Sequence, residues 1–258
     1  MISVKSGKEI DLMRRAGDIL ARCFLAVEAV VCEGARTADI DRVATEFIRS
    51  HSASPSFLGQ KGLVEGAPDY PASACISIND EVIHGIPGPR RLRAGDVVSI
   101  DMGVYYNGYH SDMARTYIIG QATELAFNLV KVTEESFWVG IKGAVSGKRV
   151  SDISRLIQSH VEAAGFSAVR DYVGHGIGTE LHEEPQIPNF TDRRSRRGQR
   201  LTNGMTLAIE PIVNTGGYDV EVQPDKWTVV TKDRSLSAHY ENTILVNGDA
   251  PLILSMAI

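Results

Sequence analysis

The sequence lacks most of the features that mark secreted, membrane-spanning and nucleic-acid-binding proteins. Its 258 residues include three cysteines and no CxxC pair, which excludes a disulfide framework and predicts free thiols in a reducing cytoplasm. A net charge of -5 excludes a surface that binds nucleic acid over its whole extent. The apolar run 19–32 is interrupted by Arg22 and Glu28, so neither a signal peptide nor a membrane span is predicted. We therefore expect a cytoplasmic monomer.

Apolar periodicity predicts an α+β fold for a single catalytic domain, residues 1–258. A capping box at Ser6 and Glu9 starts a first helix that we expect to end at Gly34, and a second helix begins at Thr37. The order helix, helix, strands then occurs again, and no change of composition marks a domain boundary. This order favours a curved antiparallel sheet with two pairs of helices on one face and two matching halves. The other predicted elements are helices over 122–142 and 150–164, strands over 74–78, 97–106, 109–119, 167–173, 205–209, 227–231 and 237–246, and a long loop over 52–71.

Residues 172–185 combine three closely spaced glycines with two histidines, the second of which is followed directly by two acids. Three glycines in five residues are unsuited to a helix or strand interior, but they let the backbone approach a ligand closely. A flexible turn with solvated histidines is the alternative interpretation. Four acids in or beside strand-like apolar runs argue against that alternative, because an ordinary core strand has no use for a carboxylate. These acids are Asp101, Asp112, Glu210 and Glu241.

The hairpin around Asn107 and Gly108 allows a geometric prediction. If these two residues form the turn, Asp101 pairs with Ala114, and Asp112 lies on the same face as its diagonal neighbour. Such diagonal positions are roughly 7–8 Å apart at the backbone, so both side chains can reach one ion. Two unpaired carboxylates at that distance repel each other, and a divalent cation removes the penalty.

The remaining acids extend this prediction to a dinuclear metal site. Glu210 ends an apolar strand, Glu241 lies inside another, and His175 adds an imidazole. Four carboxylates balance two divalent ions, and this oxygen-rich set suits Mn, Fe, Co or Zn better than a structural thiolate zinc site. Two ions roughly 3.5–4 Å apart with a bridging hydroxide would make the protein a hydrolase.

These motifs together resemble the type I methionine aminopeptidases, which have the pita-bread fold. The match runs from the first helix to Glu241, and it implies that Asp101, Asp112, His175, Glu210 and Glu241 are the metal ligands. The motifs that carry it are Cys75–Asn79, His84–Pro87, Ser99–Asp101, Gly174–Gly178, His182–Pro185, Ile209–Pro211 and Lys232–Ala238.

The resemblance also implies roles in removing the N-terminal methionine of nascent polypeptides. His182 would hydrogen-bond the scissile carbonyl, His84 would contact the peptide nitrogen, and Glu210 would carry the proton. The free α-amine of the substrate would bind a metal ion, and the second residue of the substrate would have to be small. The chain starts at its first helix, without the N-terminal zinc-binding extension of the longer eukaryotic enzymes, so we expect a bacterial-type form.

The methionine pocket implied by the resemblance is a soft, aromatic-lined slot. This sequence departs from the family pattern at Leu181, a position that is often aromatic, and at Gln60, which is often tyrosine. The loop Gln60–Asp69 is also longer than usual. The residues implied for the pocket are Tyr70, Cys75, Leu181 and Trp227, with His84 and His182 beside the peptide bond and Phe57 near the rim.

Three other classes of protein are alternatives to a methionine aminopeptidase. A prolidase or proline-specific aminopeptidase shares the ligand set but carries a large additional N-terminal domain. A metal-free creatine amidinohydrolase or a nonenzymatic binding protein would have lost ligands.

Residues 192–200 contain five arginines, and we expect either a solvated loop or a salt-sensitive docking site for ribosomal RNA through Arg193–Arg200.

Overall fold

The fold is built around one long hairpin, β4 (Val97–Tyr106) and β5 (Tyr109–Ile118). The structure is a computed structural model that describes residues 2–62, 65–191 and 198–257. Within these residues, nine antiparallel strands form the main sheet, in the order β1-β4-β5-β14-β9-β7-β8, with β2 beside β4 and β15 beside β14. The other strands of this sheet are β1 (Ser54–Pro55), β2 (Ala74–Ile78), β7 (Gly174–Gly176), β8 (Glu183–Ile187), β9 (Thr206–Ile209), β14 (Glu241–Leu245) and β15 (Leu252–Ile253).

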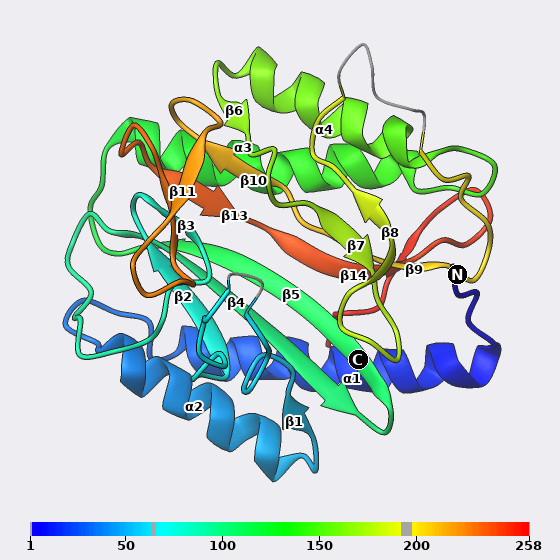
Figure 1. The fold of residues 1–258 in the computed structure, drawn as a ribbon, viewed down its shortest axis with the longest axis horizontal. Coiled ribbons are helices and arrows are strands. Elements are labelled where there is room, and N and C mark those ends of the chain that lie inside the picture. Colours follow the sequence, from blue (N-terminus) through cyan, green and yellow to red (C-terminus); the bar gives the residue numbers. More distant parts are fainter. Residues whose placement is uncertain (1, 63–64, 192–197, 258) are drawn as a thin grey trace.

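Two small antiparallel sheets flank the main sheet (Figure 1). One has the order β13-β10-β6 and the other the order β11-β12-β3. The second of these sheets pairs β3 of the first half with β12 of the second half, so it ties the two halves together. Their strands are β3 (Glu81–Ile83), β6 (Ser167–Ala168), β10 (Ile212–Asn214), β11 (Val220–Val222), β12 (Val229–Thr231) and β13 (Ser237–His239).

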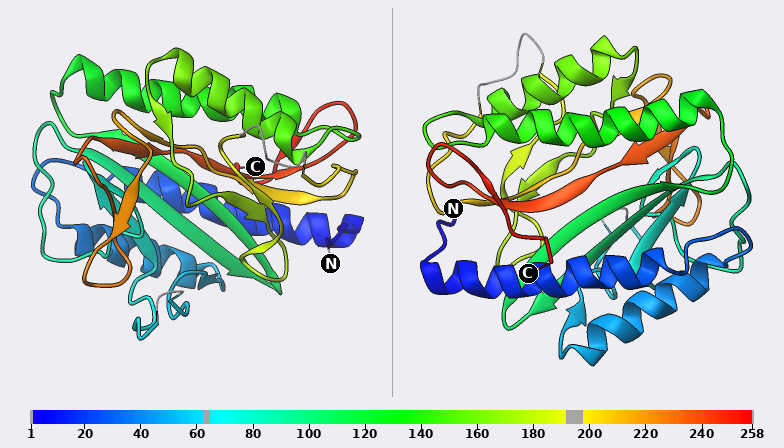
Figure 2. Two further views of the ribbon diagram at one scale, coloured as in Figure 1. Left: turned by 45° about the horizontal axis from the view of Figure 1, so that its top comes forward. Right: turned by 180° about the vertical axis from the view of Figure 1, so that it is seen from behind.

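Two pairs of helices bury separate cores against the strands. In the first pair, α1 (Gly7–Glu28) packs on the β4–β5 hairpin and α2 (Thr37–Ser50) lies against α1, β1 and β2. The pair α3 (Glu124–Gly140) and α4 (Val150–Ala163) packs on strands of the second half. A short 3-10 turn, η1 (Ile141–Gly143), follows α3. From behind, α1 and α3 cross the same face of the molecule (Figure 2). This arrangement confirms the predicted α+β, pita-bread class.

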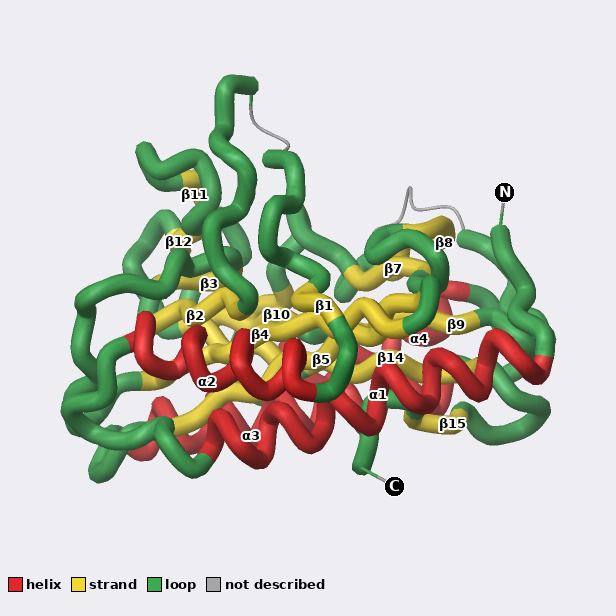
Figure 3. Tube along the Cα trace, turned by 90° about the horizontal axis from the view of Figure 1, so that it is seen from below, coloured by secondary structure: helices red, strands yellow, loops and turns green. Residues whose placement is uncertain are grey.

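The opposite face of the sheet carries loops instead of helices. Figure 3 shows the loops around β11, β12, β7 and β8 rising on the side away from α1, α2 and α3. Alternation along β4 sends Ile100 and Met102 into the core under α1 and leaves Asp101 for the loop side. The loop side is therefore where polar side chains of the strands meet.

The register of the β4–β5 hairpin confirms the prediction from the Asn-Gly turn. Asp101 pairs with Ala114, and Asp112 pairs with Gly103. Asn107 and Gly108 both have positive φ, 47° and 93°, as a type I′ turn requires. Turn chemistry and a strict period of two were sufficient here because both act locally.

Three predicted boundaries were wrong, because partners distant in sequence decide where elements end. The first helix ends at Glu28, and Gly34 instead donates its N–H to Leu92 O in a turn. The strand predicted over 167–173 stops at Ala168, since its partner β10 is only three residues long. The strand predicted over 237–246 is divided at Tyr240, where the chain passes from β10 to β5 and β9 as pairing partners.

Candidate metal centre

Five neighbouring strands bring the predicted ligands to one place. Asp101 and Asp112 come from β4 and β5, and Glu241 begins β14 opposite Ala114. His175 lies on β7 opposite Ala208 of β9, and Glu210 directly follows β9. Because β4, β5, β14, β9 and β7 are consecutive in the sheet, all five side chains gather across its centre.

These side chains are buried without the partners that buried charges require. Asp112 is 3% exposed and Glu241 is 2% exposed. Asp101 Oδ1 and Glu241 Oε1 are buried and accept no hydrogen bond. Ligand atoms of Asp112, His175 and Glu241 lie within 4.8 Å of one another. An unpaired buried carboxylate is costly, so this cluster is suited to an external cation.

The raised pKa values of the four acids also indicate a cation site. Burial raises the pKa of Asp112 to about 7, although hydrogen bonds from Met113 N–H and Asp101 oppose the shift. Burial, with repulsion from Asp112, also raises the pKa of Asp101, Glu210 and Glu241 well above the usual carboxyl range. Without a cation the cluster therefore holds protons, and a divalent ion would replace them.

The tautomer of His175 is set for metal binding. Its Nδ1–H donates to Gly176 O at 2.8 Å, because a carbonyl oxygen can only accept. This leaves Nε2 with a free lone pair, 3.7 Å from Glu210 Oε1. Burial, with the nearby His182 ring, lowers the pKa of His175 to about 3, so the imidazole is neutral. The donor set of four carboxylates and one neutral imidazole fits divalent transition-metal ions.

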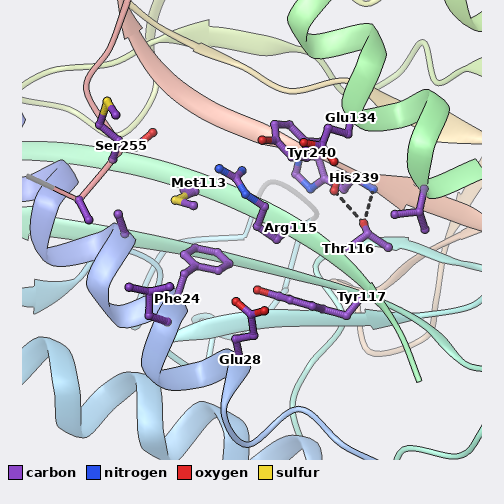
Figure 4. A pocket seen from close by; sticks show the side chains of 15 residues that line it. Phe24, Glu28, Met113, Arg115, Thr116, Tyr117, Glu134, His239, Tyr240 and Ser255 are labelled. Atoms are coloured by element: carbon purple, nitrogen blue, oxygen red, sulfur yellow. Dashed lines mark hydrogen bonds between the residues drawn. The ribbon is translucent and has the colours of Figure 1, made fainter. Parts of the chain in front are cut away.

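Arg115 supports this centre from the helix side of the sheet. Its guanidinium donates to Ala114 O and Glu241 O, both at 2.7 Å, and lies 4.1 Å from the centroid of the Tyr240 ring. It projects into a cavity of about 410 Å³ between α1 and α3 (Figure 4). Arg115 thus fixes the backbone of a candidate ligand without neutralising its carboxylate.

His239 is a residue of this centre that the sequence reasoning missed. Its ring is 2% exposed, and Nε2 has no hydrogen-bond partner. Nε2 lies 3.6 Å from Glu210 Oε2 and 3.7 Å from Glu241 Oε2. The sequence did contain a signal, because His239 precedes Glu241 by two positions inside an apolar run.

The two histidines assigned to catalysis by resemblance lie at the mouth of the cluster. His182 is exposed as a residue, but its ring stands 4.5 Å from the ring of the buried His175. His84 has a positive φ of 59°, and its ring lies 5.7 Å from Tyr172 and 6.0 Å from Trp227. A strained backbone at a histidine beside a buried cluster is typical of functional sites. Burial lowers the pKa of His182, and burial with the nearby His182 lowers that of His84 to about 4.

The residues predicted for the methionine pocket come together in one apolar cluster. Phe57, Tyr70, Cys75 and Leu181 are buried in it, and Trp227 packs against it. The Tyr70 and Trp227 rings meet edge-on at 5.0 Å.

The loop Gln60–Asp69 is tied to the rim of this pocket. Trp227 Nε1 donates to Pro68 O at 2.9 Å, and Lys226 Nζ donates to Glu65 O and Gly66 O, each at 3.0 Å. Residues 65–68 of this loop therefore lie against the edge of the slot. The arginines expected to dock on RNA fall mostly in 192–197, outside the described residues.

Four acids and an imidazole on one face of a pita-bread sheet define a metal-dependent hydrolase. The sequence pattern of metallopeptidase family M24 matches residues 11–248. The methionine aminopeptidase of Clostridium perfringens is 52% identical over 256 residues, 99% of each chain. Methionine aminopeptidase 1 of Bacillus subtilis is 44% identical over 246 residues, 95% of this chain and 96% of its own. The chain therefore belongs to metallopeptidase family M24 and, within it, to the methionine aminopeptidases.

Solved structures agree with this assignment. A methionine aminopeptidase from Thermotoga maritima superposes with a TM-score of 0.93 at 41% identity, over 99% of this chain and 100% of its own. A prolidase from Pyrococcus furiosus reaches a TM-score of 0.76 at 20% identity, and this chain covers 66% of it. The prolidase likeness shows the shared fold alone.

Proposed function

We infer that the protein is a metal-dependent aminopeptidase that removes the N-terminal methionine from peptides and nascent proteins, with the whole chain acting as one catalytic unit. The observation that carries this inference is the buried pair Asp112 and Glu241 grouped with the free Nε2 of His175, with Asp101 and Glu210 beside them, in a chain of this family. No helix among the described residues is long and apolar enough to cross a membrane.

The proposed ligands are Asp101, Asp112, His175, Glu210 and Glu241, holding two divalent ions from among Co, Mn, Fe and Zn. Bound ions of this kind lower the pKa of a water molecule and polarise a carbonyl. The charge balance supports two ions, since four carboxylates leave four negative charges to neutralise. Glu210 is the proposed proton carrier, because it borders the cluster beside two imidazoles.

The mouth histidines act as neutral hydrogen-bond donors in this proposal. The lowered pKa values of His84 and His182 keep both rings uncharged near pH 7. A neutral imidazole N–H from His182 stabilises the oxygen of the scissile carbonyl as negative charge develops there. His84 holds the peptide nitrogen that becomes the leaving amine.

His239 is proposed to keep two of the ligand carboxylates in place. Its neutral ring, with a pKa lowered by burial to about 3, presents Nε2 to Glu210 and Glu241 together. In the neutral tautomer with its hydrogen on Nε2, the N–H dipole favours both carboxylate oxygens. His239→Gln keeps a donor amide at this position, so metal content should fall less in it than in His239→Leu, as measured by elemental analysis.

Substrate choice follows from the slot and from the histidine loops. The slot lined by Phe57, Tyr70 and Trp227 suits the unbranched thioether of methionine. The loops that carry His84 and His182 border the site on the exit side, so a small second residue is preferred. Equal rates on Met-Gly and Met-Leu peptides would contradict this preference.

The decisive assay compares Met-Gly-Xaa with Xaa-Pro peptides, each with and without chelator. We expect cleavage of the methionyl peptides alone, its loss on chelation and its return on adding a divalent ion. Cleavage confined to Xaa-Pro peptides would favour a prolidase. Chelator-resistant cleavage would contradict the metal-dependent mechanism.

Docking on the ribosome remains a prediction from the sequence. Arginines in 193–200 would bind phosphate, so cosedimentation with ribosomes should weaken steeply as salt rises. Serine at the four arginines between 193 and 197 should abolish that cosedimentation and leave peptide cleavage unchanged. Equal, salt-insensitive binding by both proteins would remove this role. Cytoplasmic location and a monomeric state stay predictions too.

A further inference from the structure

Lys5 is a buried charge that the proposed mechanism does not use. Its side chain is 2% exposed, and Nζ lies 2.6 Å from Glu183 Oε2, whose side chain is 14% exposed. The two residues are 178 positions apart in sequence. A lysine is almost never this buried unless it is paired, so the ion pair is a built feature of the fold.

The ion pair lies inside the turn that leads to His182. Glu183 follows His182 directly, and its Oε1 accepts from Glu180 N at 3.3 Å and from Thr179 Oγ1 at 3.4 Å. A Cβ on Gly178 would collide with the Lys5 side chain and with Glu183 Oε1. The last glycine of the glycine-rich stretch therefore leaves the space that the ends of the Lys5 and Glu183 side chains occupy.

Backbone contacts hold both ends of this arrangement. Lys5 N–H donates to Gly204 O at 2.8 Å, and His110 N–H donates to Gly178 O at 2.8 Å. The carboxylate of Glu9 accepts from Ser6 N–H at 2.7 Å and from the Tyr109 hydroxyl at 2.8 Å. Figures 1 and 3 both show the N-terminal segment beside β8 and β9. The segment before α1 is thus fixed independently of the loop that it contacts.

Because of this geometry, removal of Lys5 would change the position of His182. Removing one partner of a buried ion pair leaves an uncompensated charge, which the loop relieves by moving Glu183 toward water. His182 is attached to that residue and is exposed. Its orientation therefore depends on the backbone that Glu183 anchors.

We propose that Lys5 is a positioning residue for His182, acting through its ion pair with Glu183. The inference rests on the oxyanion role proposed above for His182. A shift of about 1 Å in a positioned group can cost roughly 10²-fold in rate. A displacement of His182 on loss of the Lys5–Glu183 ion pair would therefore lower kcat measurably.

The test is a double-mutant cycle measured with a Met-Gly peptide at saturating metal. We expect Lys5→Met to lower kcat roughly 10-fold with KM little changed, and Lys5→Arg to recover most of the loss. In the His182→Ala background, Lys5→Met should cause no further loss, because the group it positions is gone. Lys8→Met, at an exposed position of α1, is the matched control and should match wild type.

The outcomes separate the inference from the function on which it rests. An equal kcat loss from Lys5→Met in both backgrounds, or no loss in either, overturns the positioning role. A normal kcat in His182→Ala overturns the role of His182 itself. If Lys5→Met does not fold, as judged by thermal unfolding, Glu183→Gln removes the same ion pair at constant size and is placed in the same cycle.

Discussion

Acidic groups lie in two neighbouring places in the protein, and they are paired within the chain in one place and unpaired in the other. Glu183 has its own lysine, 2.6 Å away, and further donors from its loop. Asp101 and Glu241 each keep a buried oxygen with no partner, and the nearby side chains are other acids and neutral imidazoles. The first arrangement is complete within the chain, whereas the second requires a cation from outside.

The difference explains what each place contributes. A charge satisfied by the chain itself fixes backbone geometry, which a loop carrying an exposed histidine needs. Charges left unsatisfied create affinity for a divalent ion, at the expense of the stability of the ion-free protein. Substitutions in the two places should therefore have different signatures, one in metal content and the other in rate alone.

The largest effect is expected from Asp101→Asn, which removes an anionic ligand from the unsatisfied cluster. Activity should be abolished and bound metal should fall, because the donor set loses charge. Elemental analysis with a peptide assay checks both. Asp39→Asn, exposed at the start of α2, is the control and should change neither. Full activity with normal metal content in Asp101→Asn would remove Asp101 from the ligand set.

The ion-free protein should lose stability as pH rises. The pKa of Asp112 is raised from 3.8 to about 7 in the fold, so the folded state holds the proton more tightly than the unfolded chain. Its stabilising contribution is complete below the unfolded value and is lost as pH rises through about 7. The free energy of unfolding should thus fall by on the order of a few kcal/mol between these values.

Thermal unfolding of chelator-treated protein tests this fall. Asp112→Asn should flatten the pH dependence relative to wild type, and added divalent ion should restore the lost stability above pH 7. An ion-free wild type whose unfolding temperature follows the same pH dependence as Asp112→Asn would show that the acid cluster carries no such penalty.

His182→Ala should retain metal and lose roughly 10²–10³-fold in kcat, the usual loss for one oxyanion donor. This result would assign His182 to the reaction with the substrate and exclude it from the metal ligands. The measurement is metal content and steady-state kinetics on the same preparation. Loss of metal in the variant would move His182 into the coordination shell.

The smallest effect is expected from Gly178→Ala, which disturbs the satisfied ion pair without changing a charge. The new methyl group displaces Lys5 and Glu183, so kcat should fall roughly 10-fold while metal content stays normal. Gly7→Ala is the control, since a Cβ there meets nothing within 4 Å. Metal loss in Gly178→Ala would show that metal binding by the acid cluster depends on the Lys5–Glu183 ion pair.

Much of the candidate site was predictable because its signals are local. The Asn107–Gly108 turn and the period of two placed Asp101 and Asp112 on one face, and the register agrees. Acids inside apolar runs marked Glu210 and Glu241, since a core strand rarely carries them. The family resemblance added the pocket residues, which the structure gathers in one cluster.

The sequence by itself determined the hairpin register, the helix pairs and the acids and histidine suited to a metal centre, because turn chemistry, periodicity and composition act over a few residues. Only the tertiary structure decided that His239 faces two of those acids and that Lys5 meets Glu183. It also decided that the strand after Ser237 divides at Tyr240. These outcomes depend on which distant segments pack together, and burial then sets whether a charge is satisfied by the chain or left for an ion.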